Sequence, residues 1–326
     1  MTETARKILD EVLKGKEVTI EEANILMNPE QTELEELLSV ANRLTRRVFR
    51  NEISMCAIYP AKVGKCSGDC AFCAQSAHHQ CDVQPIYVNE LRGNEIIENA
   101  KKLWSQGVRH YSLVTSGEQL SDIEFEAILQ IFERLGKETK MSLCASVGNL
   151  TPKRAESLKR VGVLRYHHNI ETSSSYFPMI CSTHTYDDKM KTIEVVRQVG
   201  MELCCGGIIA MGESKEQRVE MAFALKEIDM ECVPINILNA IPGTRLEYQT
   251  PIAVEEILRT IAVFRVILPN KVLKYAGGRE NAMGEEEYKG YQAGINALLA
   301  GNYLTTSGKD LEQEKNTLLN KGYVIK

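Results

Sequence analysis

The sequence predicts an α/β protein built on a (β/α)8 barrel of the TIM type. After residue 51, short apolar runs alternate about eight times with longer amphipathic stretches, and the length of 326 residues suits a barrel of this kind. A doubly wound open sheet is the alternative. Because the sequence contains no linker or low-complexity stretch, we expect one barrel over residues 51–326, preceded by a helical extension over residues 1–50.

The N-terminal extension has the periodicity of helices. Apolar residues recur at three- and four-residue steps in ETARKILDEVLKG (3–15) and TELEELLSVANRLTRRVFR (32–50), and Gly15 is a suitable stop for the first helix. The chain begins without the apolar core of a signal peptide, and no apolar run approaches the roughly 20 residues of a membrane span. The formal charge of −5 gives no basic footprint for nucleic acid. We therefore expect a cytoplasmic protein with neither a membrane nor a nucleic-acid partner.

The barrel segment supplies eight candidate strands in order. They are SMCAIYPA (54–61), HYSLVTS (110–116), MSLCASVG (141–148), VLRYHHNIE (163–171), MELCCGGIIA (201–210), CVPINIL (232–238), VLKYAGG (272–278) and NALLAGNYL (296–304). Between them, NEIIENAKKLWSQG (94–107), SDIEFEAILQIFERLGKE (121–138) and KMKTIEVVRQVG (189–200) predict helices. Since barrel chemistry sits at the carboxyl ends of the strands, we expect the polar and sulfur residues there to face one another.

Three of the ten cysteines lie together in KVGKCSGDCAFCAQS (62–76), as Cys66, Cys70 and Cys73. Disulfides are rare in the cytosol, so this C-x3-C-x2-C spacing points to metal binding. A closed zinc site is one alternative, with His78, His79 or Cys81 as its fourth ligand. We favour a [4Fe–4S] cluster held by three thiolates, because it leaves one iron open for a further ligand.

The same spacing, with the aromatic Phe72 before the last cysteine, resembles the radical S-adenosylmethionine (SAM) superfamily. The resemblance implies that the open iron binds SAM, whose reductive cleavage gives a radical that abstracts hydrogen from unactivated carbon. The stretch LVTSGE (113–118) is similar to the superfamily's turn that meets the SAM ammonium group. Its last three residues, Ser116, Gly117 and Glu118, are therefore candidate SAM contacts.

Further stretches resemble the biotin synthase family. They are YHHNIETS (166–173), STHTYDDKMKT (182–192), CCGGIIAMGES (204–214), VPINIL (233–238), YAGGREN (275–281) and GNYLTTSG (301–308). The resemblance implies a radical SAM sulfurtransferase that inserts sulfur into dethiobiotin to form biotin. It also implies a flavodoxin or ferredoxin as electron donor and a homodimer. Another radical SAM enzyme, similar to the maturase of iron-only hydrogenase, and a non-enzymatic iron–sulfur or zinc redox sensor are the alternatives.

Individual site residues follow from this resemblance. Glu171 stands where the family places an acidic residue on the SAM ribose, and Lys189 where it places an arginine near the SAM carboxylate. Asn169 can donate and accept hydrogen bonds, which suits a site shared by SAM and dethiobiotin. Asn236 and Lys62 stand at positions that face dethiobiotin.

The resemblance also implies an auxiliary cluster as the source of sulfur. Its better-known form is a [2Fe–2S] cluster, held by three cysteines on the second, third and fifth strands and by an arginine near the seventh. Cys144, Cys204 and Arg279 stand at three of these positions, but Ser112 stands on the second strand. A serine oxygen is a harder ligand than a thiolate. We therefore favour an auxiliary cluster of four irons on Cys81, Cys144 and Cys204, as in a subgroup of the family associated with anaerobes, over a [2Fe–2S] cluster.

The remaining cysteines are given no ligand role. Cys205 adjoins Cys204, and consecutive strand residues point to opposite faces, so we expect Cys204 to face inward and Cys205 outward. Cys56 and Cys232 begin their strands, at the end away from barrel chemistry. Cys181 lies in a loop whose direction the sequence does not define.

Overall fold

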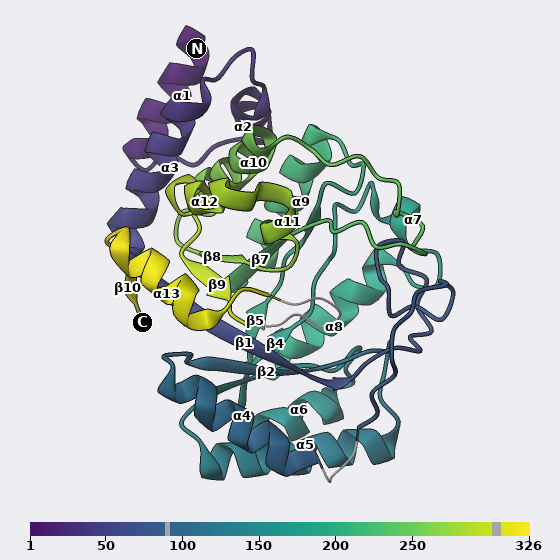
Figure 1. Ribbon diagram of the computed structural model, residues 1–326. Helices are drawn as coiled ribbons and strands as arrows, with labels where there is room; N and C mark the ends of the chain where they lie inside the picture. Colours follow the sequence, from purple (N-terminus) through teal and green to yellow (C-terminus); the bar gives the residue numbers. More distant parts are fainter. Residues whose placement is uncertain (89–91, 302–307) are drawn as a thin grey trace.

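The chain folds into a closed parallel barrel surrounded by helices (Figure 1). The computed structural model describes residues 1–88, 92–301 and 308–326. The strands follow the order β10-β1-β2-β3-β4-β5-β7-β8-β9, β6 pairs with β7, and β9 pairs with β1, which closes the sheet. The predicted (β/α)8 barrel is confirmed, and the open sheet is wrong.

Strands lie where the sequence has its apolar runs. Their bounds are β1 Glu52–Lys62, β2 His110–Thr115, β3 Ser142–Ser146, β4 Val163–His167, β5 Glu202–Cys204, β6 Gly207–Ile209, β7 Cys232–Ile237, β8 Val272–Tyr275, β9 Ala297–Leu299 and β10 Val324–Ile325. The run predicted over residues 201–210 is divided into β5 and β6. Residues 302–307, which carry most of the GNYLTTSG motif, lie outside the described residues.

Helices precede the barrel and alternate with its strands. Their bounds are α1 Glu3–Leu13, α2 Ile20–Met27, α3 Leu34–Phe49, α4 Gly93–Ser105, α5 Asp122–Glu138, α6 Pro152–Arg160, α7 Phe177–Ile180, α8 Tyr186–Gln198, α9 Lys215–Ile228, α10 Val254–Ile267, α11 Arg279–Met283, the 3₁₀ helix η2 Gly284–Tyr288, α12 Lys289–Ala293 and α13 Leu311–Asn320. No described helix combines the length and the apolar character needed to cross a membrane.

The first three helices pack on the outside of the barrel rather than inside it. Helix α3 packs against α10 and α12, and α2 packs against α9 and α10 (Figure 1). The buried face of α3 includes Leu37, Ala41 and Leu44, which follow the three- and four-residue steps of the sequence. Helix α2, which the periodicity did not predict, begins with a capping box in which Thr19 and Glu22 bond each other's backbone N–H.

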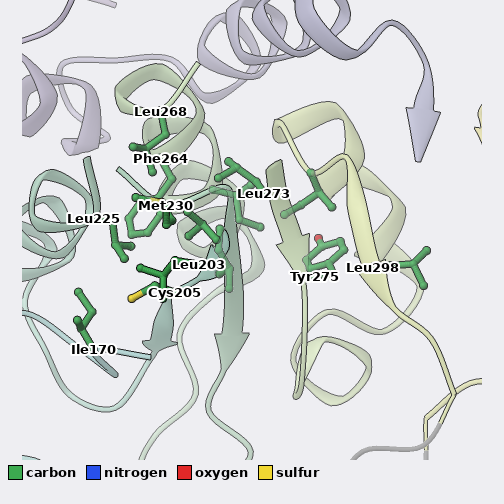
Figure 2. Close-up of a cluster of buried hydrophobic side chains, with 14 of the residues drawn as sticks. Ile170, Leu203, Cys205, Leu225, Met230, Phe264, Leu268, Leu273, Tyr275 and Leu298 are labelled. Atoms are coloured by element: carbon green, nitrogen blue, oxygen red, sulfur yellow. The ribbon is translucent and has the colours of Figure 1, made fainter. Parts of the chain in front are cut away.

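Strand alternation decides which side chains face the interior of the barrel. On β5, Leu203 lies in the hydrophobic core between strands and helices, and so does Cys205, just after the strand (Figure 2). Cys204, between them, lines the cavity inside the barrel. Cys204 and Cys205 therefore point to opposite sides of the sheet, as the sequence predicts. This alternation concentrates the chemistry described below within the barrel.

Candidate active site

Two adjoining cavities occupy the barrel interior and its mouth. The larger, which we call the inner cavity, measures about 390 Å³ and extends between the strands. The smaller, the mouth cavity, measures about 170 Å³ and lies beside the cysteine loop. His167, Asn169 and Glu171, at the end of β4, line both cavities. The two spaces therefore share a wall.

The cysteine loop folds so that its thiols reach both cavities. Cys66 and Cys70 line the mouth cavity, whereas Cys73 lines the inner one. The Cys66 N–H donates to the Gln75 carbonyl at 2.9 Å, and this closes the loop on itself. The Gly68 N–H points to the Cys66 sulfur at 3.4 Å. A metal-bound sulfur could accept the same contact.

The three loop thiols do not lie close enough together to bind one ion as a set. Sulfur ligands of one zinc ion lie within about 4.6 Å of each other, twice the zinc–sulfur bond. Among the described residues, Cys66, Cys70 and Cys73 do not meet this condition as a set. The ring nitrogens of His78 and His79 contact the loop carbonyls of Ser67 and Cys73, each at 2.9 Å. Cys70 instead meets the condition together with Cys181 and His184.

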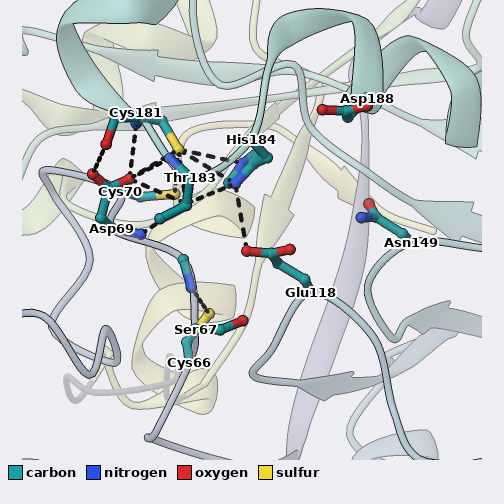
Figure 3. A network of polar contacts seen from close by, with 12 residues as sticks. Cys66, Ser67, Asp69, Cys70, Glu118, Asn149, Cys181, Thr183, His184 and Asp188 are labelled. Atoms are coloured by element: carbon teal, nitrogen blue, oxygen red, sulfur yellow. Dashed lines mark hydrogen bonds and ion pairs between the residues drawn. The ribbon is translucent and has the colours of Figure 1, made fainter.

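A carboxylate clamps the cysteine loop to the segment between α7 and α8 (Figure 3). Asp69 accepts hydrogen bonds from the backbone N–H groups of Ser182 and Thr183, at 2.9 and 3.1 Å, and from the Ser182 hydroxyl at 2.6 Å. Although burial opposes ionisation, these bonds hold the pKa of Asp69 well below its usual value. The sulfur of Cys181 lies 4.0 Å from that of Cys70 and 3.3 Å from an Asp69 oxygen.

The turn after β2 forms the opposite side of the mouth cavity. The Ser116 hydroxyl donates to the Gly64 carbonyl at 2.7 Å, which fixes this turn against the cysteine loop. Gly117 and Glu118 line the cavity. At Gly148, where φ is +84°, a Cβ atom would lie 2.4 Å from the Glu118 carbonyl oxygen. Glycine is therefore required there for the close approach of the two turns.

The end of β4 and helix α8 contribute the charged and polar groups of the mouth cavity. Glu171 and Lys189 form an ion pair at 3.9 Å, and the Asn169 amide donates to Glu171 at 3.3 Å. His168 is buried, and its Nε2 has no hydrogen-bond partner among the described residues. Burial holds the pKa of His168 well below its usual value, so the ring is neutral at pH 7. An unpartnered buried nitrogen beside a cavity fits a polar ligand.

Two asparagines present amide groups to the inner cavity. Backbone groups fix each side chain: the Asn236 amide donates to the Gly207 carbonyl at 3.1 Å, and the Asn169 carbonyl accepts from the Gly206 N–H at 3.1 Å. Phe72 lines the same cavity. Lys62 does not, because its ammonium group pairs with Glu124 at 2.7 Å.

Three further thiols line the deep part of the inner cavity. They belong to Cys56 on β1, Cys144 on β3 and Cys204 on β5. The Lys274 ammonium group lies 3.5 Å from the Cys204 sulfur. A hydrogen bond from Cys232 and the charge of Lys274 lower the pKa of Cys204, against its burial. The thiols of this region fit soft metal chemistry in a largely apolar pocket.

Two predicted residues of the auxiliary centre lie elsewhere. Cys81 is outside the inner cavity, with its thiol 3.4 Å from the Pro242 carbonyl, so the structure does not bring it to Cys144 and Cys204. Arg279 is buried in ion pairs with Glu287 at 3.0 Å and Glu314 at 2.6 Å, and it does not line the inner cavity. These carboxylates compensate its charge within the C-terminal part of the fold.

Cys56 and Lys274 line the inner cavity but were not predicted as site residues from the sequence. The signal for Cys56 was the two-residue period of β1, since Cys56 and Ile58 share one face of the strand and both line the inner cavity. The start of this strand reaches the deep part of the cavity rather than a remote end of the barrel. For Lys274, the signal was a charged residue inside a strand pattern, two residues before Ala276, which lines the same cavity.

Comparison with protein families gives two matches that together cover most of the barrel. Residues 62–225 match the radical SAM superfamily, and residues 234–324 match the biotin and thiamin synthesis associated domain. The biotin synthase of Acetivibrio thermocellus is 45% identical over 312 residues, which are 96% of each chain. The biotin synthase of Clostridioides difficile is 42% identical over 98% of each chain.

Solved structures show the same fold at low sequence identity. Methylornithine synthase (PylB) superposes with a TM-score of 0.82 at 18% identity, over 98% of this chain and 97% of its own. The [FeFe]-hydrogenase maturase HydG also gives 0.82, at 17% identity, over the whole of this chain and 76% of its own. These likenesses concern the barrel and its outer helices.

Proposed function

Because the chain belongs to the biotin synthase family of radical SAM enzymes, we propose that its mouth cavity binds SAM and its inner cavity binds dethiobiotin. The reaction is the radical SAM insertion of sulfur into dethiobiotin, which forms biotin. The shared wall of the two cavities supports this assignment of SAM and dethiobiotin. Ligands bound on its two sides would be neighbours. SAM and a [4Fe–4S] cluster are the cofactors of the family.

Cys66, Cys70 and Cys73 would hold the [4Fe–4S] cluster at this wall. When bound, this cluster and SAM supply a hydrogen-abstracting radical, and an auxiliary cluster supplies sulfur. Glu171 and Lys189 offer one negative and one positive group, which match the hydroxyls and the carboxylate of SAM. The turn of Ser116, Gly117 and Glu118, together with the unpartnered His168 nitrogen, supports a polar ligand in the mouth cavity.

Asn169 and Asn236 would orient dethiobiotin. Each amide is already fixed by backbone hydrogen bonds but keeps capacity for a further one, which suits the donors and acceptor of a ureido ring. Phe72 would contribute apolar contact. Lys62 would have to leave Glu124 to reach the substrate carboxylate. The barrel walls would shield the reacting carbons from solvent.

For the auxiliary cluster we propose Cys56, Cys144 and Cys204 as ligands. All three line the deep end of the inner cavity, whereas Cys81 does not. Three thiolates leave one iron of a four-iron cluster open, and Ser112 offers only a hard oxygen toward a [2Fe–2S] cluster. A four-iron auxiliary cluster is therefore favoured.

Iron counting with Mössbauer spectra tests this ligand set on anaerobically reconstituted protein. We expect about eight irons per chain in the wild type, the sum of two four-iron clusters, and about half of that in Cys56→Ala. Cys81→Ala is the matched control and should keep the full count. About six irons with a [2Fe–2S] spectrum, or a loss in Cys81→Ala but not in Cys56→Ala, would overturn the proposal. Biotin formation from dethiobiotin, SAM and a reductant tests the reaction itself.

Three finer proposals rest on the family resemblance. We propose that flavodoxin or ferredoxin is the electron donor, that the chain forms a homodimer, and that residues 1–50 are an extension of the barrel domain over residues 51–326. Light scattering of the purified protein tests the dimer, and SAM cleavage with each reduced donor tests the first proposal. Removal of residues 1–50 with retention of a folded barrel would support the third.

A further inference from the structure

Cys181 is a buried thiol outside the cysteine loop, and it lies directly beside that loop (Figure 3). It comes just after α7, where the sequence alone gives its side chain no direction. The Cys181 sulfur lies 4.0 Å from the Cys70 sulfur, and 3.3 and 3.6 Å from Nδ1 and Nε2 of His184. Two thiols and an imidazole therefore meet between the cysteine loop and the segment that leads into α8.

The separations of these ligand atoms are those of a single-ion site. Zinc–sulfur bonds of about 2.3 Å and zinc–nitrogen bonds of about 2.0 Å, at tetrahedral angles, place two sulfur ligands about 3.8 Å apart and a sulfur and a nitrogen about 3.5 Å apart. The ligand atoms of Cys70, Cys181 and His184 all lie within 4.8 Å of one another. Within the described ranges of the chain, no other group of three His, Cys, Asp or Glu residues meets that condition. An ion could therefore bind here with little movement of the side chains.

Neighbouring side chains fix the ring of His184. Phe177 meets it edge-on, with the ring centroids 5.8 Å apart, and the Thr183 hydroxyl oxygen lies 3.3 Å from its Nδ1. With Nε2 as the ligand, Nδ1–H is free to donate to this hydroxyl. An outer contact of this kind orients most histidines that bind metals.

Two carboxylates make this place favourable for a cation. An Asp69 oxygen lies 3.3 Å from the Cys181 sulfur, and a Glu118 oxygen lies 3.9 Å from Nδ1 of His184. The guanidinium of Arg245 approaches Asp69 only to 4.0 Å, and its side chain is 47% exposed. Opposite charges attract more strongly away from bulk water, so a buried ion would benefit from both carboxylates.

The mouth cavity gives an ion access to this place. Cys70 and His184 line that cavity, so a fourth ligand such as water could be supplied from it. Two sulfur donors and one nitrogen donor suit zinc, whereas magnesium and calcium require oxygen ligands. Zinc also binds such sites more tightly than ferrous iron does. The donor set therefore points to zinc.

We propose that Cys70, Cys181 and His184 form a site for a single zinc ion in the cluster-free protein. The site shares Cys70 with the [4Fe–4S] cluster, so zinc and the cluster would exclude each other. The ion site stands on its own geometry, and its competition with the cluster rests on the proposed function. Cys181 and His184 lie outside the C-x3-C-x2-C motif, so this site differs from a zinc loop closed by a ligand from residues 78–81.

Cobalt(II), which occupies tetrahedral zinc sites and absorbs visible light, is the probe. It is titrated anaerobically into full-length protein that a chelator has freed of iron, and zinc is then added to displace it. We expect sulfur-to-cobalt absorption that saturates at about one ion per chain. Cys181→Ala and His184→Gln should each lower the affinity at least about tenfold, since even the loss of an outer partner of a ligand costs about 10–100-fold. Cys73→Ala, which removes a loop thiol outside the ion site, is the matched control and should bind cobalt as the wild type does.

Three results would overturn the ion site. Unchanged cobalt binding in Cys181→Ala and His184→Gln would assign the ion to other thiols. A loss in Cys73→Ala equal to that in Cys181→Ala would assign it to the three loop cysteines. Loss of the native circular dichroism on removal of iron would leave no folded cluster-free chain to bind an ion.

Reconstitution of the cluster tests the competition for Cys70. Iron and sulfide are added with and without an equimolar amount of zinc, and iron uptake is followed. Zinc should slow uptake in the wild type but not in Cys181→Ala, which keeps all three loop thiols. Equal inhibition in both proteins, or none in the wild type, would overturn the competition. A chain that binds cobalt through Cys181 but forms no biotin would sink the proposed function and leave the ion site standing.

Discussion

At the scale of single residues, Glu314 shows how burial sets the charge of a side chain. Glu314 lies on α13 with 7% of its surface exposed, and it accepts from Arg279 at 2.6 Å. Burial raises the pKa of Glu314 to about 7, although the charge of Arg279 acts in the opposite direction. Glu287, which also pairs with Arg279, is a second acidic group in the same network and adds to the rise.

The raised pKa gives a testable pH dependence of stability. A carboxyl group whose folded pKa lies above its unfolded value stabilises the fold fully below that unfolded value, and this contribution is lost as the pH rises through 7. Relative to Glu314→Gln, the wild type should therefore lose up to about 3 kcal/mol between pH 4 and pH 8. Thermal unfolding of both proteins across this range measures the difference. Glu312→Gln, on the exposed face of the same helix, is the control, and parallel curves for wild type and Glu314→Gln would contradict the prediction.

Arg279 and Lys274 show that the place of a residue relative to the end of a strand decides where its side chain points. Arg279 stands in a recognisable motif, yet it comes after β8 and its side chain turns toward Glu287 and Glu314. Lys274 lies within β8, in the face of that strand that looks into the barrel. A motif gives the neighbourhood of a residue in the chain, whereas the direction of its side chain depends on where the strand ends.

At the scale of the elements, the turns after β2 and β3 depend on one glycine. Gly148 and Gly162 both have positive φ, +84° and +93°. A Cβ at Gly148 would meet the Glu118 carbonyl at 2.4 Å, whereas one at Gly162 would meet nothing within 4 Å. Alanine substitution at both positions therefore separates two effects. Both variants would have backbone strain, but only Gly148→Ala would also have a steric clash.

We expect Gly148→Ala to destabilise the protein by about 1–3 kcal/mol more than Gly162→Ala. The added methyl group would also push the turn of Glu118 away from the mouth cavity, so the affinity for SAM should fall. Thermal unfolding and a SAM titration of both variants measure these effects. If the two variants had equal stability and equal affinity for SAM, the close approach of the turns would not matter.

Elements were easier to predict than the directions of side chains. The apolar runs located the barrel strands because buried parallel strands are short and apolar along their whole length. Cys81 illustrates the limit: its distance from Cys73 in the sequence is short, but the loop that carries it turns toward Pro242 and away from the cavity. The path of such a loop is set by contacts between distant segments, which a local pattern does not contain.

At the scale of the whole molecule, β1 joins the first and last parts of the chain. It pairs with β2 and β9 within the barrel and with β10 at its start (Figure 1). The C-terminal strand is therefore tied to the strand that leads into the cysteine loop. Barrel closure depends on these backbone ladders and on the core between strands and helices, which are main-chain and apolar contacts.

These contacts lead to a prediction about removal of the clusters. In small metal-dependent domains the metal supplies the folding energy, and chelation unfolds them. Here a large hydrophobic core surrounds the barrel, whereas the cysteine loop is held by a few hydrogen bonds and by the Asp69 clamp. Chelator-treated protein should therefore keep the circular dichroism of the native barrel, with a lower Tm because the bound state is no longer favoured.

Hydrogen exchange should show where the clusters matter. Their loss should accelerate exchange in residues 62–81, which carry the loop thiols, and in residues 180–184, which Asp69 joins to that loop. Strands β2 and β3 should exchange as slowly as before, since their ladders are intact. Asp69→Asn should reproduce the faster exchange at residues 180–184 in the cluster-loaded protein, because the clamp is weakened there. Collapse of protection throughout the barrel on chelation would instead mean that the clusters, and not the core, hold the fold.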